Sequence, residues 1–267
     1  HISGEPLDEG LNHRSRTQLS RYGNAEYFWE AADRQGLKSF VINYPAGWPA
    51  KLKHGVMSLY TWPIPESLPR TLKPNQIFEF PLHSSTKKEG ISVPDLSNLR
   101  IFIVHDVQNI NQKKNLDGIR CLYLANNNDE KIPMKREVWS NWITQKFTYK
   151  NQDLPCLYRI KLKDLSPDGS SITIERSAIY NTKGWCSPNS YAPNMIKAVP
   201  FFDRSDIPEV EYMIEGGVAP FLKYARQEVT NLAKIISHAK DTMDWDVCFF
   251  HIHHLDSVNH KMLAEMV

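Results

Sequence analysis

The chain has 267 residues, of which 41% are hydrophobic and 23% are charged. That length and composition are typical of a globular protein built as one large α/β domain or as a core with an insertion. The formal net charge of +2 gives no electrostatic reason to expect a nucleic-acid polymer or an anionic membrane as partner. No stretch approaches the ~20 consecutive apolar residues of a membrane span, so we expect no membrane segment in this chain.

Cysteines and termini give less information. The four cysteines lie far apart without C-x-x-C spacing, which excludes a zinc finger, argues against a disulfide framework and slightly favours the cytoplasm. The start, HISGEPLDEG, has neither an initiator Met nor a signal peptide, and the end, HKMLAEMV, has no helix stop signal. We therefore expect the natural protein to extend beyond both ends, which leaves its localisation open.

The first elements in chain order are a helix and a strand. Residues 24–36, NAEYFWEAADRQG, are expected to form a helix, because Asn24 can cap its start and Gly36 can end it. Residues 37–45, LKSFVINYP, are expected to form a buried strand that Pro45 stops. The alternation of helix and strand predicts a layered α/β sheet, and ligands bind at the carboxyl ends of strands in such sheets.

The middle of the chain has a different character. Between residues 67 and 199 it contains several strand-like segments: RIFIVHDV, IRCLYLANN, WITQKFTY, YRIKLKDL and SSITIERSAIY. The last two alternate apolar and polar residues and flank SPDGS, whose residues favour a turn. We predict a β-rich insertion here. A separate β domain is the alternative, although no flexible linker flanks the region.

The α/β pattern returns near the end of the chain. Residues 218–241 place apolar side chains on one helical stripe, and WDVCFFHIHH then has the length and composition of a strand. A further helix is expected from LDSVNHKMLAEM. We therefore predict that residues 1–66 and 200–267 form parts of one α/β core and that residues 67–199 form an insertion or cap.

A cluster of histidines follows the last strand. Asp256 and His260 are four residues apart, so on a helix both side chains face the same way and could share one cation. A carboxylate oxygen and an imidazole nitrogen suit zinc or a similar divalent ion. Two ligands are too few for a catalytic site, and such spacings are common. Alternatively, Asp256 is a helix N-cap and His260 lies on the helix surface.

Other histidines are weaker candidates. His253 is the best of the remaining cluster as a contact to substrate or to a metal ligand, because it leads directly into Asp256. His54 lies in a loop that could reach the sheet edge and contact substrate. His105 and Asp106 end a strand within the predicted insertion, where a structural use is the simpler expectation. No phosphate-binding loop and no G-x-S-x-G nucleophile motif is present.

Several segments, taken in order, resemble the type I phosphodiesterase/nucleotide pyrophosphatase family of the alkaline phosphatase superfamily. AEYFWEAADRQGLKSFVINYPAGWPA is similar to that family's helix, strand and Pro-bounded loop, and HGVMSLYTWPIP to the segment that follows. EVWSNWITQKF and LYRIKLKDLSPDGSSITIERSAIY resemble inserted β segments of its prokaryotic members. WDVCFFHIHHLDSVNH resembles the strand that ends in a D-x-x-x-H metal motif. The series covers nearly the whole chain.

The resemblance implies a fold and a chemistry. It implies a doubly wound, mostly parallel sheet with helices on both faces, and two divalent metal ions of zinc type at its carboxyl edge. Asp256 and His260 map to ligands of one ion. The other ion is held in the family by an early Asp, a Thr or Ser nucleophile and an Asp-His pair. The nucleophile attacks phosphorus and displaces the leaving group of the ester, and metal-activated water then hydrolyses the phospho-enzyme intermediate.

Departures from the family pattern limit what this chain should do. The first Asp and the nucleophile are expected upstream of His1, and the chain contains no Asp-His-Gly motif. We therefore expect a metal-dependent hydrolase of phosphate esters, acting on a small-molecule phosphate ester or nucleotide, in which this fragment alone is inactive. Related phosphomonoester, phosphonate or sulfate hydrolysis is an alternative, and so is a non-catalytic binding protein on the same fold.

Overall fold

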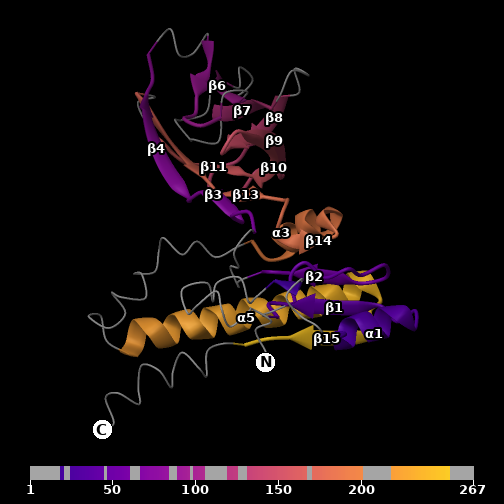
Figure 1. Ribbon diagram of the computed structural model, residues 1–267. Helices are drawn as coiled ribbons and strands as arrows, with labels where there is room; N and C mark the ends of the chain where they lie inside the picture. The colour runs from indigo at the N-terminus through magenta and orange to yellow at the C-terminus, as the bar shows by residue number, and fades with distance from the viewer. Residues whose placement is uncertain are drawn as a thin grey trace, which may run out of the picture. The chain divides into compact units, whose positions relative to one another are not determined.

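The computed structural model divides into two compact units, each of which is described by itself (Figure 1). The first unit comprises His1–Leu72, Phe147–Pro155 and Tyr180–Val267, and the second comprises Lys73–Lys146 and Cys156–Ile179. Within these spans the structure describes the following residues: 19–20, 25–44, 47–60, 67–83, 89–96, 99–105, 119–125, 131–166, 170–200 and 218–252.

A small sheet forms the core of the first unit. Its strand order is β14 (Cys186–Ser187), β2 (Val56–Ser58), β1 (Ser39–Ile42) and β15 (Val247–Phe250). β1 pairs in parallel with both β2 and β15, whereas β14 pairs with β2 in the antiparallel direction. The predicted strands LKSFVINYP and WDVCFFHIHH are therefore confirmed as β1 and β15, although both strands end earlier than these segments, at Ile42 and Phe250.

β1 is buried along its whole length because both of its faces and both of its edges are covered. In parallel register, Val41 lies beside Phe249 on one face, and Phe40 lies beside Cys248 on the other. Trp29 contacts Phe249 edge-on, with 5.9 Å between ring centroids, and Tyr191 contacts Phe40 at 6.4 Å. A continuous apolar run of this kind is typical of a parallel strand covered on two sides.

The helices of the first unit follow local sequence signals. α1 (Phe28–Arg34) begins where the Glu30 carboxylate accepts a hydrogen bond from the backbone N–H of Tyr27 at 3.3 Å, and it ends before Gly36, whose φ of +80° is a left-handed conformation. Near the end of the described chain, α5 (Val218–Met243) leads directly into β15. The predicted helix 218–241 is confirmed by α5. A helix within 24–36 is confirmed by α1, but it is shorter than predicted and its N-cap is Tyr27, not Asn24. Between them lie the short helices η6 (Asn189–Tyr191) and α3 (Ala192–Ala198).

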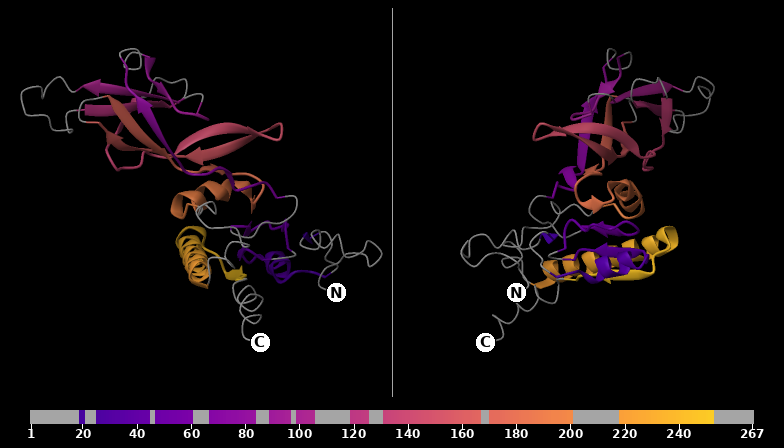
Figure 2. Two further views of the ribbon diagram at one scale, coloured as in Figure 1. Left: turned by 90° about the vertical axis from the view of Figure 1, so that its left-hand side faces the viewer. Right: turned by 45° about the vertical axis from the view of Figure 1, so that its right-hand side comes forward.

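The remaining strands form three further sheets, which Figure 2 shows from two other sides. Their orders are β3-β13-β10-β9, β11-β12-β4 and β5-β6-β7-β8. The bounds are β3 Thr71–Lys73, β4 Gln76–Pro81, β5 Ile91–Ser92, β6 Leu99–His105, β7 Ile119–Ala125, β8 Lys131–Met134, β9 Ile143–Tyr149, β10 Gln152–Tyr158, β11 Ile160–Leu165, β12 Ser171–Arg176 and β13 Ile179–Asn181.

These pairings correct the predicted fold class. A doubly wound, mostly parallel sheet with helices on both faces is wrong, because the described residues are rich in strands and most strand pairs are antiparallel. Antiparallel pairing joins β11 to β12, β12 to β4, and β5 through β8 in sequence. The physical reason is connectivity: parallel strands need long crossovers, usually helical, and the described helices are too few to supply them for this many strands.

Candidate functional site

Three strand ends meet at one edge of the first unit's sheet. The parallel register aligns Ile42, the last residue of β1, with Ser58 of β2 and with Phe250 of β15. Two backbone hydrogen bonds extend the ladder just past these ends: Asn43 N–H donates to the Ser58 carbonyl at 2.9 Å, and His251 N–H donates to the Ile42 carbonyl at 3.1 Å. The carboxyl ends of the three parallel strands therefore lie level with one another.

The turn that leaves β1 has an uncommon backbone conformation. Asn43 has a φ of 56° and is only 3% exposed. Left-handed backbone is uncommon for residues other than Gly, although Asn tolerates it better than most, and such residues cluster at functional sites. The turn determines the direction in which the next residue, Tyr44, leaves the sheet.

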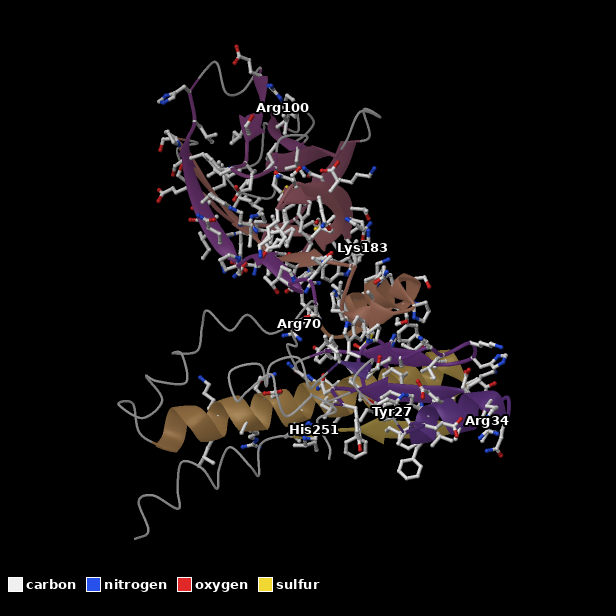
Figure 3. The ribbon with its side chains drawn as sticks, in the orientation of Figure 1. Tyr27, Arg34, Arg70, Arg100, Lys183 and His251 are labelled. Atoms are coloured by element: carbon white, nitrogen blue, oxygen red, sulfur yellow. The ribbon has the colours of Figure 1, made fainter. Side chains whose placement is uncertain are left out.

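Aromatic side chains gather around this turn. Trp29 of α1 is 1% exposed and contacts the Tyr44 ring edge-on, with 4.8 Å between centroids, while Tyr27 stacks on its face at 4.7 Å. Tyr44 in turn meets His251 edge-on at 6.5 Å between centroids. Gly47 is required beside them, because a Cβ at that position would lie 2.6 Å from Cζ2 of Trp29. Figure 3 labels Tyr27 and His251 in this unit.

Helix α5 extends beyond the same edge. Its 26 residues span about 39 Å, whereas the four residues of β15 span about 13 Å. The helix runs back to the start of β15 and lies alongside the strands, so its amino-terminal part projects past their carboxyl ends (Figure 1).

Charged residues accompany Tyr60, which follows β2 at this edge. The Tyr60 hydroxyl donates to the Val199 carbonyl at 2.9 Å, and Nη1 of Arg70 donates to the Leu59 carbonyl at 2.5 Å. Burial raises the pKa of Tyr60 well above its ordinary value, the nearby Tyr180 and the Glu228 carboxylate of α5 raise it further, and the Arg70 guanidinium opposes them. Tyr60 is therefore a protonated structural donor rather than an acid–base group.

Two buried hydroxyls lie at opposite ends of the small sheet. Ser58 Oγ at the carboxyl end of β2 and Ser39 Oγ at the amino end of β1 have no hydrogen-bond partner within the described part of the chain. Both residues are 0% exposed. Buried hydroxyls without a protein partner commonly bind an ordered water.

The strongest predicted ligands follow the last described residue. Asp256, His260 and His253 lie outside the described residues, since the structure describes the chain as far as Ile252. The segment that contains them begins after Ile252, two residues past the end of β15. The assignment of Asp256 and His260 to a metal and of His253 to a nearby contact stays a prediction.

His54 lies at the other end of the parallel strands. It precedes β2, and its side chain is exposed. Its backbone N–H donates to Oδ1 of Asp33 at 2.7 Å, and the N–H of Lys53 donates to both carboxylate oxygens at 3.0 Å. Sequence reasoning missed Asp33, a buried carboxylate that holds this loop through its backbone. The structure therefore does not bring His54 to the carboxyl edge, and its proposed contact with substrate stays a prediction.

The described residues contain neither a metal cluster nor a membrane helix. No group of three or more His, Cys, Asp or Glu side chains among them could hold a metal ion. Likewise, no helix in the described ranges is long and apolar enough to cross a membrane.

Comparisons with known proteins found no relative of this chain. No family model matches the chain, and neither a curated protein nor a solved structure matches it.

Proposed function

We propose that this chain is part of a metal-dependent hydrolase of phosphate esters, of the phosphodiesterase or nucleotide pyrophosphatase type. One observation carries the proposal: β1 and β15 pair in parallel and in register, so their carboxyl ends lie together. The loop YPAGWPA leaves β1 at this edge, and HIHHLDSVNH begins at this edge where β15 ends. Two segments that resemble the phosphodiesterase family, although distant in sequence, thus start from one place.

The donor set favours a divalent cation. In this proposal Asp256 and His260 hold one ion through a carboxylate oxygen and an imidazole nitrogen, a combination that suits zinc. A second ion and a Thr or Ser nucleophile upstream of His1 are part of the proposal, as the family resemblance implies. A bound divalent cation supplies Lewis-acid stabilisation of the charged phosphoryl oxygens.

The proposal is tested on the protein expressed from its complete reading frame. Asp256→Asn and His260→Ala should each remove about one zinc ion per chain and most hydrolysis, because each removes a ligand of the same ion. Zinc is measured by elemental analysis, and hydrolysis with bis(p-nitrophenyl) phosphate as diester and p-nitrophenyl phosphate as monoester. His83→Ala, which removes an exposed histidine that follows β4, is the matched control.

Each outcome discriminates. Unchanged zinc content and activity in the His260→Ala protein would refute the ligand assignment. A faster reaction with the monoester would mean that the protein is a related phosphomonoesterase and not a diesterase. A wild-type protein that binds no zinc and cleaves neither compound would favour a non-catalytic binding protein.

A further inference from the structure

We infer that the outer edge of β15 is a docking surface for a further strand, which a part of the natural polypeptide beyond these 267 residues supplies. The inference concerns the small sheet itself, so it depends neither on the proposed hydrolase nor on its metal ligands. β15 comes last in the strand order of that sheet (Figure 1): the structure describes a partner strand on one side, β1, and none on the other.

The backbone of β15 presents hydrogen-bonding groups to this outer edge. The N–H groups of Val247 and His251 donate to the carbonyls of Lys38 and Ile42, on the side of β1, at 3.2 and 3.1 Å. Alternate residues of a strand direct their backbone groups to opposite sides, so the N–H and C=O groups between these two positions face away from β1 at Cys248 and Phe250. A neighbouring strand is the partner that such a row of groups fits.

The lack of protection distinguishes β15 from the other edge strands of the described sheets. β5 and β14 are only two residues long. The remaining edge strands, β3, β4, β8, β9 and β11, each contain a charged residue, and β4 and β8 also contain a proline. Proteins protect exposed edges with such short strands, charges and prolines. β15 has the sequence VCFF and none of these features, as is typical of an internal strand.

The burial of β15 supports the same conclusion. All four residues of β1, which has a strand on each side, are buried, whereas the four residues of β15 are half-buried or exposed. The Phe250 side chain is 51% exposed, and that of Ile252, two residues later, is 39% exposed. Because both faces of β15 carry apolar side chains, the strand that docks beside it should be apolar on both faces, as β1 is.

The size of this edge favours a segment of the same polypeptide over a second molecule. The four residues of β15 extend about 13 Å, whereas stable interfaces between separate proteins bury about 800 Å² on each partner. A strand edge of this length is too small for such an area. A segment of the same polypeptide stays near the edge at a high effective concentration, so it does not need a large interface.

Amide hydrogen exchange, measured residue by residue in the protein from its complete reading frame, tests the inference without a substitution. The amides of Cys248 and Phe250 should exchange within about tenfold of the rate of Phe249, whose N–H lies on the side of β1. Exchange at Cys248 and Phe250 as fast as in an unfolded chain would mean an open edge and overturn the inference. Slow exchange that is lost when a dimer is diluted to monomers would assign the edge to a second copy, and would overturn it as well.

A lysine at the same edge gives a second test. Phe250→Lys places a charge where the further strand lies, so it should lower the melting temperature of the complete protein by more than about 5 °C. Phe28→Lys is the matched control, because it makes the same exchange at an α1 side chain that is 79% exposed, and it should shift the melting temperature by less than about 2 °C. Equal, small shifts in the two variants would overturn the inference. The proposed hydrolase is decided separately, by the zinc content and diester hydrolysis of the wild type.

Discussion

Two central strands, β1 in the first unit and β12 in the second, show opposite burial patterns. All four residues of β1 are buried, whereas the six residues of β12 alternate between half-buried and buried positions. β1 lies between two parallel partners, and β12 lies between two antiparallel partners. A parallel strand covered on both faces has no solvated side, whereas an antiparallel strand commonly has one.

The difference shows where each sheet can carry polar chemistry. The half-buried face of β12 carries Glu175, which forms an ion pair with Lys161 at 2.7 Å across the strands. β1 has no such face, so its polar groups lie at its ends, with Ser39 at one end and Asn43 just past the other. A site in the first unit is therefore expected at the edge of the sheet and not on its face.

Lysine substitutions give the largest expected effect and test this contrast directly. Val41 and Ile42 lie on opposite faces of β1, and both are buried. Val41→Lys and Ile42→Lys should each unfold the first unit, because a buried ammonium group without a partner costs several kcal/mol. In β12 the effect should alternate: Ile174→Lys should be as damaging, whereas Thr173→Lys should change the free energy of unfolding by less than about 1 kcal/mol. Urea denaturation followed by circular dichroism measures all four.

This contrast between β1 and β12 would be wrong if the effect of a lysine depended on which residue it replaces and not on which face of the strand it occupies. A folded, wild-type-like Ile42→Lys protein would show that the second face of β1 is accessible. A Thr173→Lys protein that unfolds would show that the half-buried face of β12 is covered in solution.

Arg176 breaks the pattern of β12, because a cation occupies one of its buried positions. Its side chain is 0% exposed, and its nearest carboxylate, Oδ2 of Asp95, is 4.0 Å from Nη2. Nη1 donates to the Ser177 carbonyl at 3.1 Å and Nη2 to Oε1 of Gln76 at 3.3 Å, while Nε has no partner among the described residues. Burial lowers the pKa of Arg176, and the negative charge of Asp95 opposes that shift.

The substitution Arg176→Met should therefore leave the second unit as stable as the wild type, or stabilise it by about 1–3 kcal/mol, since an apolar side chain of similar length avoids desolvating the charge. Asp95→Asn should act in the opposite direction, because it removes the carboxylate that compensates Arg176. Both are measured as free energies of unfolding in urea. A loss of several kcal/mol in Arg176→Met would show that the guanidinium's hydrogen bonds outweigh its desolvation.

Local signals in the sequence predicted some of the elements, but they missed others, such as β2 and β4, and did not predict how the strands pair. The alternation in YRIKLKDL and SSITIERSAIY predicted two strands on either side of a turn, and β11 and β12 do pair in the antiparallel direction. The second partner of β12 is β4, which begins at Gln76, far back in the chain. Pairing between distant segments depends on which surfaces can be buried together, and no local pattern records it. The fold class was therefore wrong, although the sequence correctly predicted strands such as β1, β11 and β12.

The candidate site shows the same limit. The two strands were predicted from LKSFVINYP and WDVCFFHIHH, but β1 ends at Ile42 and β15 at Phe250, earlier than those segments do. That the two ends meet depends on the parallel register of β1 with β15, which is a tertiary property. One local signal for the turn was present, since Asn is among the few residues that tolerate a positive φ and a proline follows two residues later. No comparable sequence pattern indicated that the carboxylate of Asp33 would be buried.

The smallest expected effect concerns the exposed Glu137 and the two lysines of β11 that contact it. Nζ of Lys163 lies 3.2 Å from Oε1 of Glu137, and Nζ of Lys161 lies 3.5 Å from Oε2. The hydrogen bond from Lys163 lowers the pKa of Glu137 below its ordinary value of 4.5, and the positive charges of both lysines act in the same direction. A lowered folded-state pKa stabilises the protein at pH values above the unfolded pKa, and this stabilisation is lost as the pH falls through the folded pKa.

Glu137→Gln should therefore be slightly less stable than the wild type at neutral pH, and the difference should vanish as the pH falls well below the ordinary pKa of the carboxyl group. Urea denaturation at a series of pH values measures the difference. Glu79→Gln on β4 is the matched control, because Glu79 is exposed and forms no ion pair with any residue that the structure describes. A Glu137→Gln difference that stays constant with pH would mean that the two lysines do not stabilise the carboxylate.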